Sequence, residues 1–392
     1  MAIFYPMVIS AIAVLVTLVY ASYLDIKDRR VPFVTWYPML AVGIPATVVL
    51  LYQQTGQNGQ VPDYSIIAGY LALVASFFYA NYLDTRDDEE PFRFPYLAIV
   101  LALPALSWFA LTPTLNTQLI PWYVMFAGII GYVSYVEYKR KPEEQTRFRK
   151  KKQEPTVAET ISKWYFVLIV MIFAITSVLL FYGPGGWGAP ALSILLLSVF
   201  CGVFYIFGRM HLFGGADAWA LIFISFCIPL FPVTPLLNYP PLGFLAFSVL
   251  INALILNLVA PVGIFIINIV RGNRAPLMYM FFGFPVPGDR IQDSWGFVME
   301  DFEEKKGRVS RKFIGFFDSI RRMLSGEGRV YTKDLRERPQ EFTKELALYK
   351  AAGTVWISYA VPFIVPITAG LISAIVFGDF LLAITSFITG GR

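Results

Sequence analysis

The chain has 392 residues, of which 57% are hydrophobic and 15% are charged, and its mean hydropathy is +0.60. This composition excludes a water-soluble globular protein, a disordered chain, a collagen-like protein and a disulfide scaffold, because long uncharged runs recur at the length that crosses a bilayer. The net charge of +5 is informative only through its distribution. The composition predicts a polytopic protein in contact with the lipid bilayer.

Uncharged runs of about 17 to 25 residues mark the expected membrane spans in chain order. They fall at 3–24, 33–53, 64–83, 94–111, 119–136, 164–182, 190–207, 243–270 and 355–377, and a shorter run at 218–231 makes a tenth. The sequence therefore predicts an all-α polytopic membrane protein of about ten transmembrane helices.

The loops between these spans alternate in charge. Loops 54–63, 112–118, 183–189 and 232–242 contain no Lys or Arg, and of the 32 basic residues all but Arg392 fall on the other side. Because loops that stay in the cytoplasm carry an excess of Lys and Arg, the N-terminus is expected outside a cell membrane and the basic loops inside.

We expect four regions along the chain. Residues 1–163 form tandem helix hairpins, 164–270 a membrane core, 271–354 a small cytoplasmic module before the last helix, and 355–392 a final transmembrane helix and tail. The module is expected because its segment is the only sizeable polar block, with 16 Lys and Arg against 12 Asp and Glu.

The N-terminal region contains an internal repeat. YASYLDIKDRRVPF at 20–33 and YANYLDTRDDEEPF at 79–92 share eight of fourteen positions, and a weaker copy at 132–140 has Glu137 in the place of the acid. Each copy brings an acidic residue, Asp25 or Asp84 in the first two, to the end of a helix. Aromatic belts followed by mixed charges also recur at helix ends without shared ancestry, so both interpretations remain open.

The most unusual polar element is GGAD at 214–217, which precedes a short apolar helix. Gly214 and Gly215 allow backbone to approach closely and permit dihedrals that other residues avoid, so this turn could admit an extended polypeptide beside Asp217. The simpler interpretation makes Asp217 a helix N-cap, and both can hold together.

A carboxylate becomes a catalytic acid or base when a second one faces it across a peptide bond. Asp25 is the leading candidate for that partner, and the basic cluster after it suits anionic headgroups. Helix polarity suggests Asp217, near a helix N-terminus, as the base and Asp25, near a helix C-terminus, as the acid.

These residues resemble those of the archaeal prepilin and preflagellin peptidases, membrane aspartic proteases of the GxGD type. SYLDIKDRRVP at 22–32 and GGADAWALI at 214–222 resemble the family's two catalytic segments. VMEDFEEKKGRV at 298–309 and the apolar stretch at 356–380 resemble the C-terminal extension of its longer members.

The resemblance implies that Asp25 and Asp217 are the catalytic pair and that Gly214 with Gly215 forms the backbone turn at the site. It implies removal of short leader peptides from type IV pilin-like or archaellin precursors, as in pilus and archaellum assembly, at the cytoplasmic face. No metal, cofactor or nucleic-acid partner is expected.

Two features depart from the family pattern. Ala216 occupies the third position of GxGD, and Asp84 copies the context of Asp25, so Asp84 is the alternative first aspartate. We prefer Asp25 because its basic flank resembles the family segment, whereas Asp84 is followed by DDEE at 87–90, whose charges would be repelled by an anionic membrane surface.

Two other classes of function remain open. A tandem-repeat transporter with cytoplasmic acidic gates accounts for the repeats better, but it accounts for GGAD and for the lack of charges in mid-span worse. A non-catalytic assembly protein would use 271–354 for docking and would not need the two acids.

Overall fold

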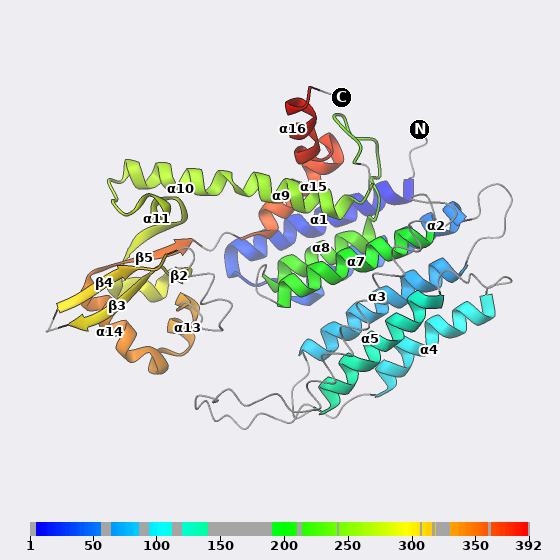
Figure 1. The fold of residues 1–392 in the computed structure, drawn as a ribbon, viewed down its shortest axis with the longest axis horizontal. Helices are drawn as coiled ribbons and strands as arrows, with labels where there is room; N and C mark the ends of the chain where they lie inside the picture. Colours follow the sequence, from blue (N-terminus) through cyan, green and yellow to red (C-terminus); the bar gives the residue numbers. More distant parts are fainter. Residues whose placement is uncertain are drawn as a thin grey trace.

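The computed structural model describes residues 5–55, 64–85, 94–111, 120–139, 190–209, 214–240, 243–305, 308–315, 318, 330–359 and 362–390. Within these residues the chain is mostly helical, and a small sheet lies near the C-terminal end of the sequence (Figure 1).

Long apolar helices form in the N-terminal region at the expected places, because uncharged runs of this length satisfy their backbone groups internally. They are α1 (Tyr5–Asp28), α2 (Tyr37–Thr55), α3 (Tyr64–Thr85), α4 (Phe94–Leu111) and α5 (Ile120–Lys139). The three repeat copies coincide with the ends of α1, α3 and α5. The expected span at 164–182 lies outside the described residues.

The central part of the chain builds the middle of the bundle from shorter helices. They are α7 (Pro190–Arg209), α8 (Gly215–Cys227), α9 (Leu245–Asn257) and α10 (Val259–Val270). Helix α8 contacts α1, α2, α7 and α9, so it lies inside the bundle, and α10 extends from the bundle toward the sheet (Figure 1).

Fewer spans are established than the ten expected. In the described part of the chain, four helical segments are long and apolar enough to cross a membrane, and a fifth arises if α15 (Ile364–Phe377) and α16 (Phe380–Ile388), bent by 55°, form one span. Helices α7 and α8 are apolar but shorter.

The expectation of an all-α fold is wrong for the C-terminal module. The module contains β1 (Gly283–Pro287), β2 (Gly296–Val298), β3 (Glu300–Lys305), β4 (Arg308–Phe313) and β5 (Thr354–Tyr359), with α11 (Leu277–Phe282), α13 (Thr332–Glu337) and α14 (Thr343–Ala352) beside them. Three strands form an antiparallel sheet in the order β1-β5-β2, and β3 pairs with β4 as a hairpin.

The last predicted helix, at 355–377, begins later than expected. Residues 354–359, TVWISY, form the central strand β5, and the helix starts at Ile364. An apolar run alone does not distinguish a buried strand from a helix, and the β-branched and aromatic residues of this segment favour a strand. The edge strand β1 contains Pro285 and Pro287, residues that sheets accept at an edge.

Helix α15 is fixed against α9 by a buried asparagine. The Asn252 side chain donates to the Gly378 carbonyl at 2.8 Å and to Ser373 Oγ at 3.1 Å, and accepts from the Phe380 N–H at 2.8 Å. The backbone groups freed at the bend between α15 and α16 are therefore satisfied inside the protein, as a membrane protein requires.

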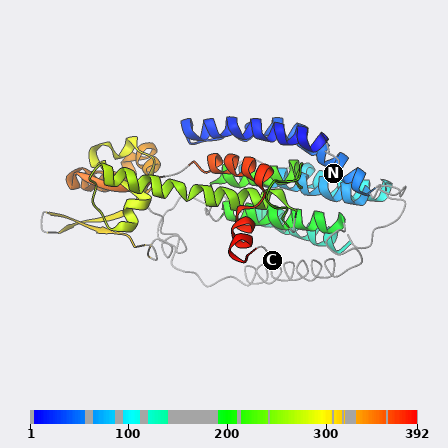
Figure 2. The same cartoon turned by 90° about the horizontal axis from the view of Figure 1, so that it is seen from above.

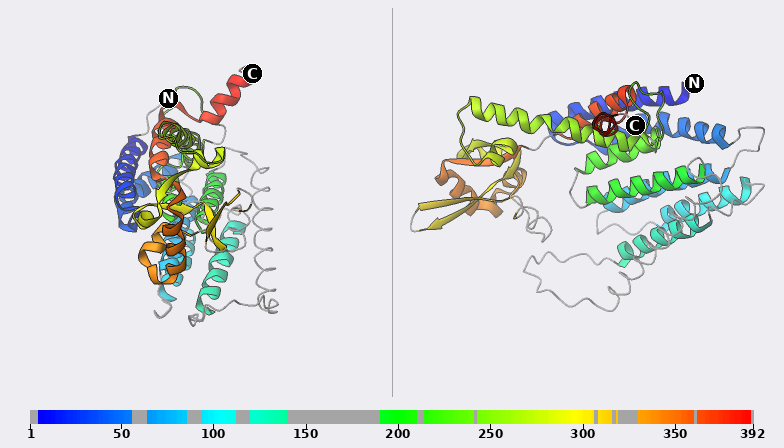
Figure 3. Two further views of the ribbon diagram at one scale, coloured as in Figure 1. Left: turned by 90° about the vertical axis from the view of Figure 1, so that its left-hand side faces the viewer. Right: turned by 45° about the horizontal axis from the view of Figure 1, so that its top comes forward.

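The sheet module lies at one end of the bundle, beyond the end of α1 (Figures 1 and 2). Helix α1 runs along one side of the bundle, and α15 lies between α1 and α9. The right-hand view of Figure 3 shows the same separation of bundle and module. The first turn of α8 and the last turn of α1 lie at the end of the bundle that faces the module.

Candidate active site

Helix α8 begins at GGAD, as the sequence indicates, but three residues earlier than an Asp217 N-cap would require. Gly214 is the N-cap, and Asp217 occupies the third helical position. The Gly214 N–H donates to Asp217 Oδ2 at 3.0 Å. The carboxylate therefore binds a backbone donor at the helix N-terminus, an arrangement that stabilises negative charge.

The two glycines of the turn differ in the space around them. A Cβ on Gly214 would lie 2.7 Å from Asp217 Oδ2, so the close approach of backbone and carboxylate requires a glycine there. Its dihedrals, φ −61° and ψ 147°, suit any residue, so the expectation of unusual backbone is wrong at this position. A Cβ on Gly215 would meet no atom of the described residues within 4 Å, so the turn has open space at this position.

The far end of α8 is held by hydroxyl groups that our sequence interpretation missed. Ser10 of α1 donates to the Cys227 carbonyl at 2.7 Å, while Thr47 of α2 and Tyr70 of α3 donate to the Phe226 carbonyl at 2.8 and 2.9 Å. The signal for them was a polar residue within an otherwise apolar helix. They satisfy the last carbonyls of a short helix that ends inside the bundle.

Asp25 lies in the last turn of α1 and is half-buried. Its carboxylate accepts a hydrogen bond from the backbone N–H of Ile364, the first residue of α15, and Arg29 contributes an opposite charge nearby. Helix α1 ends where Arg29 adopts a left-handed conformation, φ 53°, with its N–H bound to the Asp25 carbonyl at 3.2 Å. This cap fixes the turn that carries Asp25.

The structure brings Asp25 and Asp217 together. Helices α1 and α8 are in contact, and Asp25 lies within electrostatic range of the carboxyl group of Asp217. Asp217 is only 9% exposed, so the pair lies at the edge of the buried core. The polarity argument for their roles no longer separates them, because each carboxylate now faces the N-terminus of a helix.

Asp84, the alternative partner, lies in the last turn of α3, but its side chain is outside the described part of the structure. Helix α3 packs against α8 through Phe77 with Trp219, at 6.3 Å between ring centroids, and through Phe78 with Phe223, at 6.2 Å. These pairs show that α3 lies beside α8. The pairing of Asp84 with Asp217 stays a prediction, because the Asp84 side chain is not described.

Two carboxylates facing each other can activate a water molecule and protonate a leaving amine, which is the chemistry of peptide hydrolysis. Among the described residues, no group of three or more His, Cys, Asp or Glu side chains could hold a metal ion.

Comparison with known proteins finds one family. The model of the family described as "Archaeal Peptidase A24 C-terminus Type II" matches residues 275–380, which cover most of the sheet module and all of α15. The match supports an archaeal prepilin peptidase-like protein. No curated protein and no solved structure matches the chain. Neither Asp25 nor Asp217 lies in the matched segment.

Proposed function

We propose that the protein is a membrane-embedded aspartic endopeptidase that removes short leader peptides from type IV pilin-like or archaellin precursors. The observation that carries the proposal is the packing of α1 against α8, which brings Asp25 within electrostatic range of Asp217 although the two acids are far apart in the chain. The match of residues 275–380 supports a peptidase of the prepilin type in general.

Asp25 and Asp217 act together on one water molecule. One carboxylate takes a proton from the water as its oxygen attacks the scissile carbonyl. When the C–N bond breaks, the other carboxyl group gives its proton to the departing amine. The two groups share one proton and titrate as a pair.

The proposed substrate position follows from the open space at Gly215 and the apolar bundle around α8. A precursor with its apolar helix in the bilayer and its leader in the cytoplasm would bring the scissile bond to the end of the bundle that carries both acids. Basic residues lie in the last turn of α1, at Lys27, and just after it, at Arg29 and Arg30, and they support a cytoplasmic location for this end of the bundle.

Cleavage of a purified precursor tests the proposal. Incubated in detergent with a type IV pilin-like or archaellin precursor, the protein is expected to release the leader, and Asp217→Asn is expected to slow release by at least about 10²-fold, because an acid or base is lost. Asp28→Asn is the control, since Asp28 lies in the same turn as Asp25 but is exposed. An intact precursor beside folded protein, or an Asp217→Asn variant of full activity, would contradict the proposal.

A further inference from the structure

Helix α15 belongs to the C-terminal segment that matches the family model, yet it packs directly along α1. Ser22 Oγ and Thr368 Oγ1 are 2.9 Å apart, and Thr368 Oγ1 lies 3.4 Å from the Leu18 carbonyl. About one helical turn further along α1, the Ile364 N–H meets the Asp25 carboxylate. The two helices therefore run antiparallel, with polar contacts on successive turns that end at Asp25.

The Ile364 N–H is one of the donors that a helix leaves without an internal partner. It points along the axis of α15, so the helix dipole adds to its attraction for a carboxylate. The Ile364 side chain is 0% exposed and belongs to the hydrophobic core, and Thr368 binds the Ile364 carbonyl at 2.9 Å. This donor is therefore held in place by packing on the same residue.

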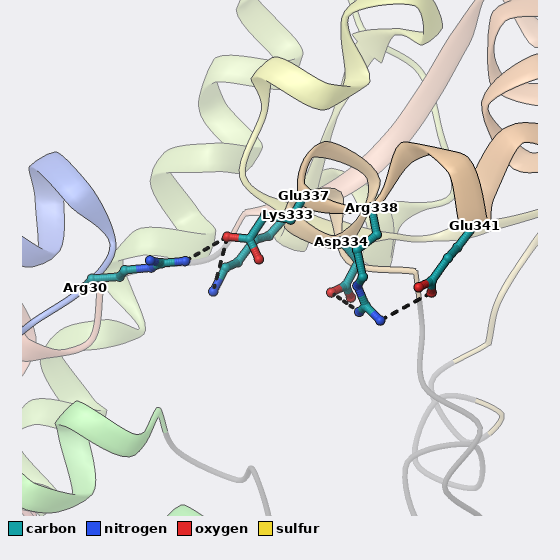
Figure 4. Close-up of polar contacts among 6 residues, drawn as sticks. All are labelled: Arg30, Lys333, Asp334, Glu337, Arg338 and Glu341. Atoms are coloured by element: carbon teal, nitrogen blue, oxygen red, sulfur yellow. Dashed lines mark hydrogen bonds and ion pairs between the residues drawn. The ribbon is translucent and has the colours of Figure 1, made fainter. Parts of the chain in front are cut away.

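The sheet module approaches the same helix end from the other side. Tyr331, the residue before α13, lies within electrostatic reach of both Arg29 and Asp25. Its ring stacks on Phe297 of β2, with ring centroids 4.6 Å apart, so the sheet fixes its orientation. Arg30 Nη2 donates to Glu337 Oε1 of α13 at 2.7 Å (Figure 4).

We propose that the C-terminal region is part of the active site, because the backbone N–H of Ile364 and the contacts of α15 with α1 hold the Asp25 carboxylate in its working position opposite Asp217. Ile364 is thus a positioning residue that acts through Asp25. The effect on catalysis rests on the proposed function. The position of the Asp25 carboxylate does not, because it is a property of the folded protein.

Replacing Ile364 by its α-hydroxy acid tests the inference, because the resulting ester lacks the N–H and keeps the side chain. The ester also makes the Phe363 carbonyl a weaker acceptor, and the control described next removes the hydrogen bond that this carbonyl accepts. The matched control is the same replacement at Ile367, whose N–H donates to the Phe363 carbonyl at 3.0 Å within α15 and does not meet Asp25. Two properties are measured in the full-length protein in detergent: the pH profile of precursor cleavage, and the pH dependence of the Asp25 infrared carboxyl band. The band is identified with ¹³C-labelled aspartate by difference from Asp25→Asn.

The ester at 364 is expected to shift the titration of the Asp25 band, and the acidic limb of the cleavage profile, to higher pH, because the ionised form loses a donor. The ester at 367 is expected to leave both near those of the unmodified protein. An unchanged Asp25 band in the 364 ester, or equal shifts in both esters, would overturn the inference. Absence of precursor cleavage by the unmodified protein would instead count against the proposed function, while the infrared comparison would still decide the positioning.

Side-chain variants at Thr368 give a second measurement. Thr368→Val removes the hydroxyl between Ser22 and Leu18 and is expected to shift the pH profile in the same direction as the 364 ester, whereas Thr368→Ser keeps the hydroxyl and is expected to restore the native profile. If Thr368→Val has the same unfolding temperature as the unsubstituted protein and also the same pH profile, the proposed role of the contacts between α15 and α1 is contradicted.

Discussion

Asp217 and Asp25 differ in how much of their setting a sequence can reveal. GGAD places Asp217 in the first turn of a short apolar helix because the glycines, the acid and the helix are adjacent in the chain. The partner of Asp217 is decided by how α1 packs against α8, and the Ile364 N–H on Asp25 comes from a helix at the other end of the sequence.

The choice between Asp25 and Asp84 can be decided by paired substitutions. Asp25→Asn is expected to slow leader release by at least about 10²-fold, because it removes one of the two groups that share the catalytic proton. Asp84→Asn is expected to leave the rate close to that of the unsubstituted protein. Both are compared by initial rates on one precursor; a large loss in Asp84→Asn with Asp25→Asn unaffected would exchange their roles.

Glu300 in β3 provides a pH-dependent test of the module. Its side chain is 0% exposed, Oε2 accepts from the Trp356 N–H at 2.8 Å, and Oε1 has no hydrogen-bond partner among the residues that the structure describes. Burial raises the pKa of the Glu300 carboxyl, against the smaller opposing effects of the Trp356 N–H and Arg311. The protonated form therefore favours the folded state.

That stabilisation is fully present below the unfolded pKa of about 4.3 and is lost as the pH rises through the folded pKa. Glu300→Gln is accordingly expected to raise the unfolding temperature at neutral pH, with a difference from the native protein that shrinks toward pH 4. Glu303→Gln, an exposed position of the same strand, is the control for the removal of a charge. A constant difference across this pH range would exclude the buried carboxyl as its cause.

At the scale of elements, α8 shows how a helix shorter than a membrane span is held inside a bundle. Its carbonyls at one end are bound by hydroxyls from three other helices, and its surface from Ala220 to Ile228 is buried. Periodicity predicts such a helix, but it does not identify the helices that surround it, because an apolar face is compatible with many neighbours.

The contact of α2 with the end of α8 depends on Gly43. A Cβ added there would overlap Cys227 Cβ, whereas one added to Gly202 of α7 would meet no atom of the described part of the chain within 4 Å. Gly43→Ala is expected to destabilise the fold by about 1–3 kcal/mol through overpacking. Gly202→Ala is expected to be neutral or stabilising by up to about 1 kcal/mol, since alanine favours helix. Thermal unfolding in one detergent checks both, and equal effects would contradict this packing.

At the scale of the whole molecule, the bundle and the sheet module meet where α1 ends. The ion pair of Arg30 with Glu337 is exposed, at 65% and 48% of the two side chains, so solvent screening limits its contribution to below about 1 kcal/mol. The ion pair therefore shows where the bundle and the module meet, but it contributes little to the stability of this interface. The sheet anchors Tyr331 beside the same turn of α1.

Chemical cross-linking checks this placement in the full-length protein. In Arg30→Lys the new amine is expected to couple to Glu337 under a carbodiimide, because the native side chains are in direct contact. Mass spectrometry would identify the linked peptides, and adding Glu337→Gln should remove that product. Coupling at position 30 to Glu341 instead, or no coupling in folded protein, would contradict the arrangement.

By itself the sequence determined the membrane-protein class, the positions of α1 to α5, and the turn that carries Asp217. These properties depend on residues that are adjacent in the chain, since a membrane span requires an uncharged run and the start of a helix is set by the residues of its first turn. Tertiary structure decided that TVWISY at 354–359 forms a central strand, that α1 meets α8, and that α15 holds Asp25. Those outcomes depend on contacts between distant segments, and hydrophobic patterning indicates which faces are apolar without indicating which face meets which.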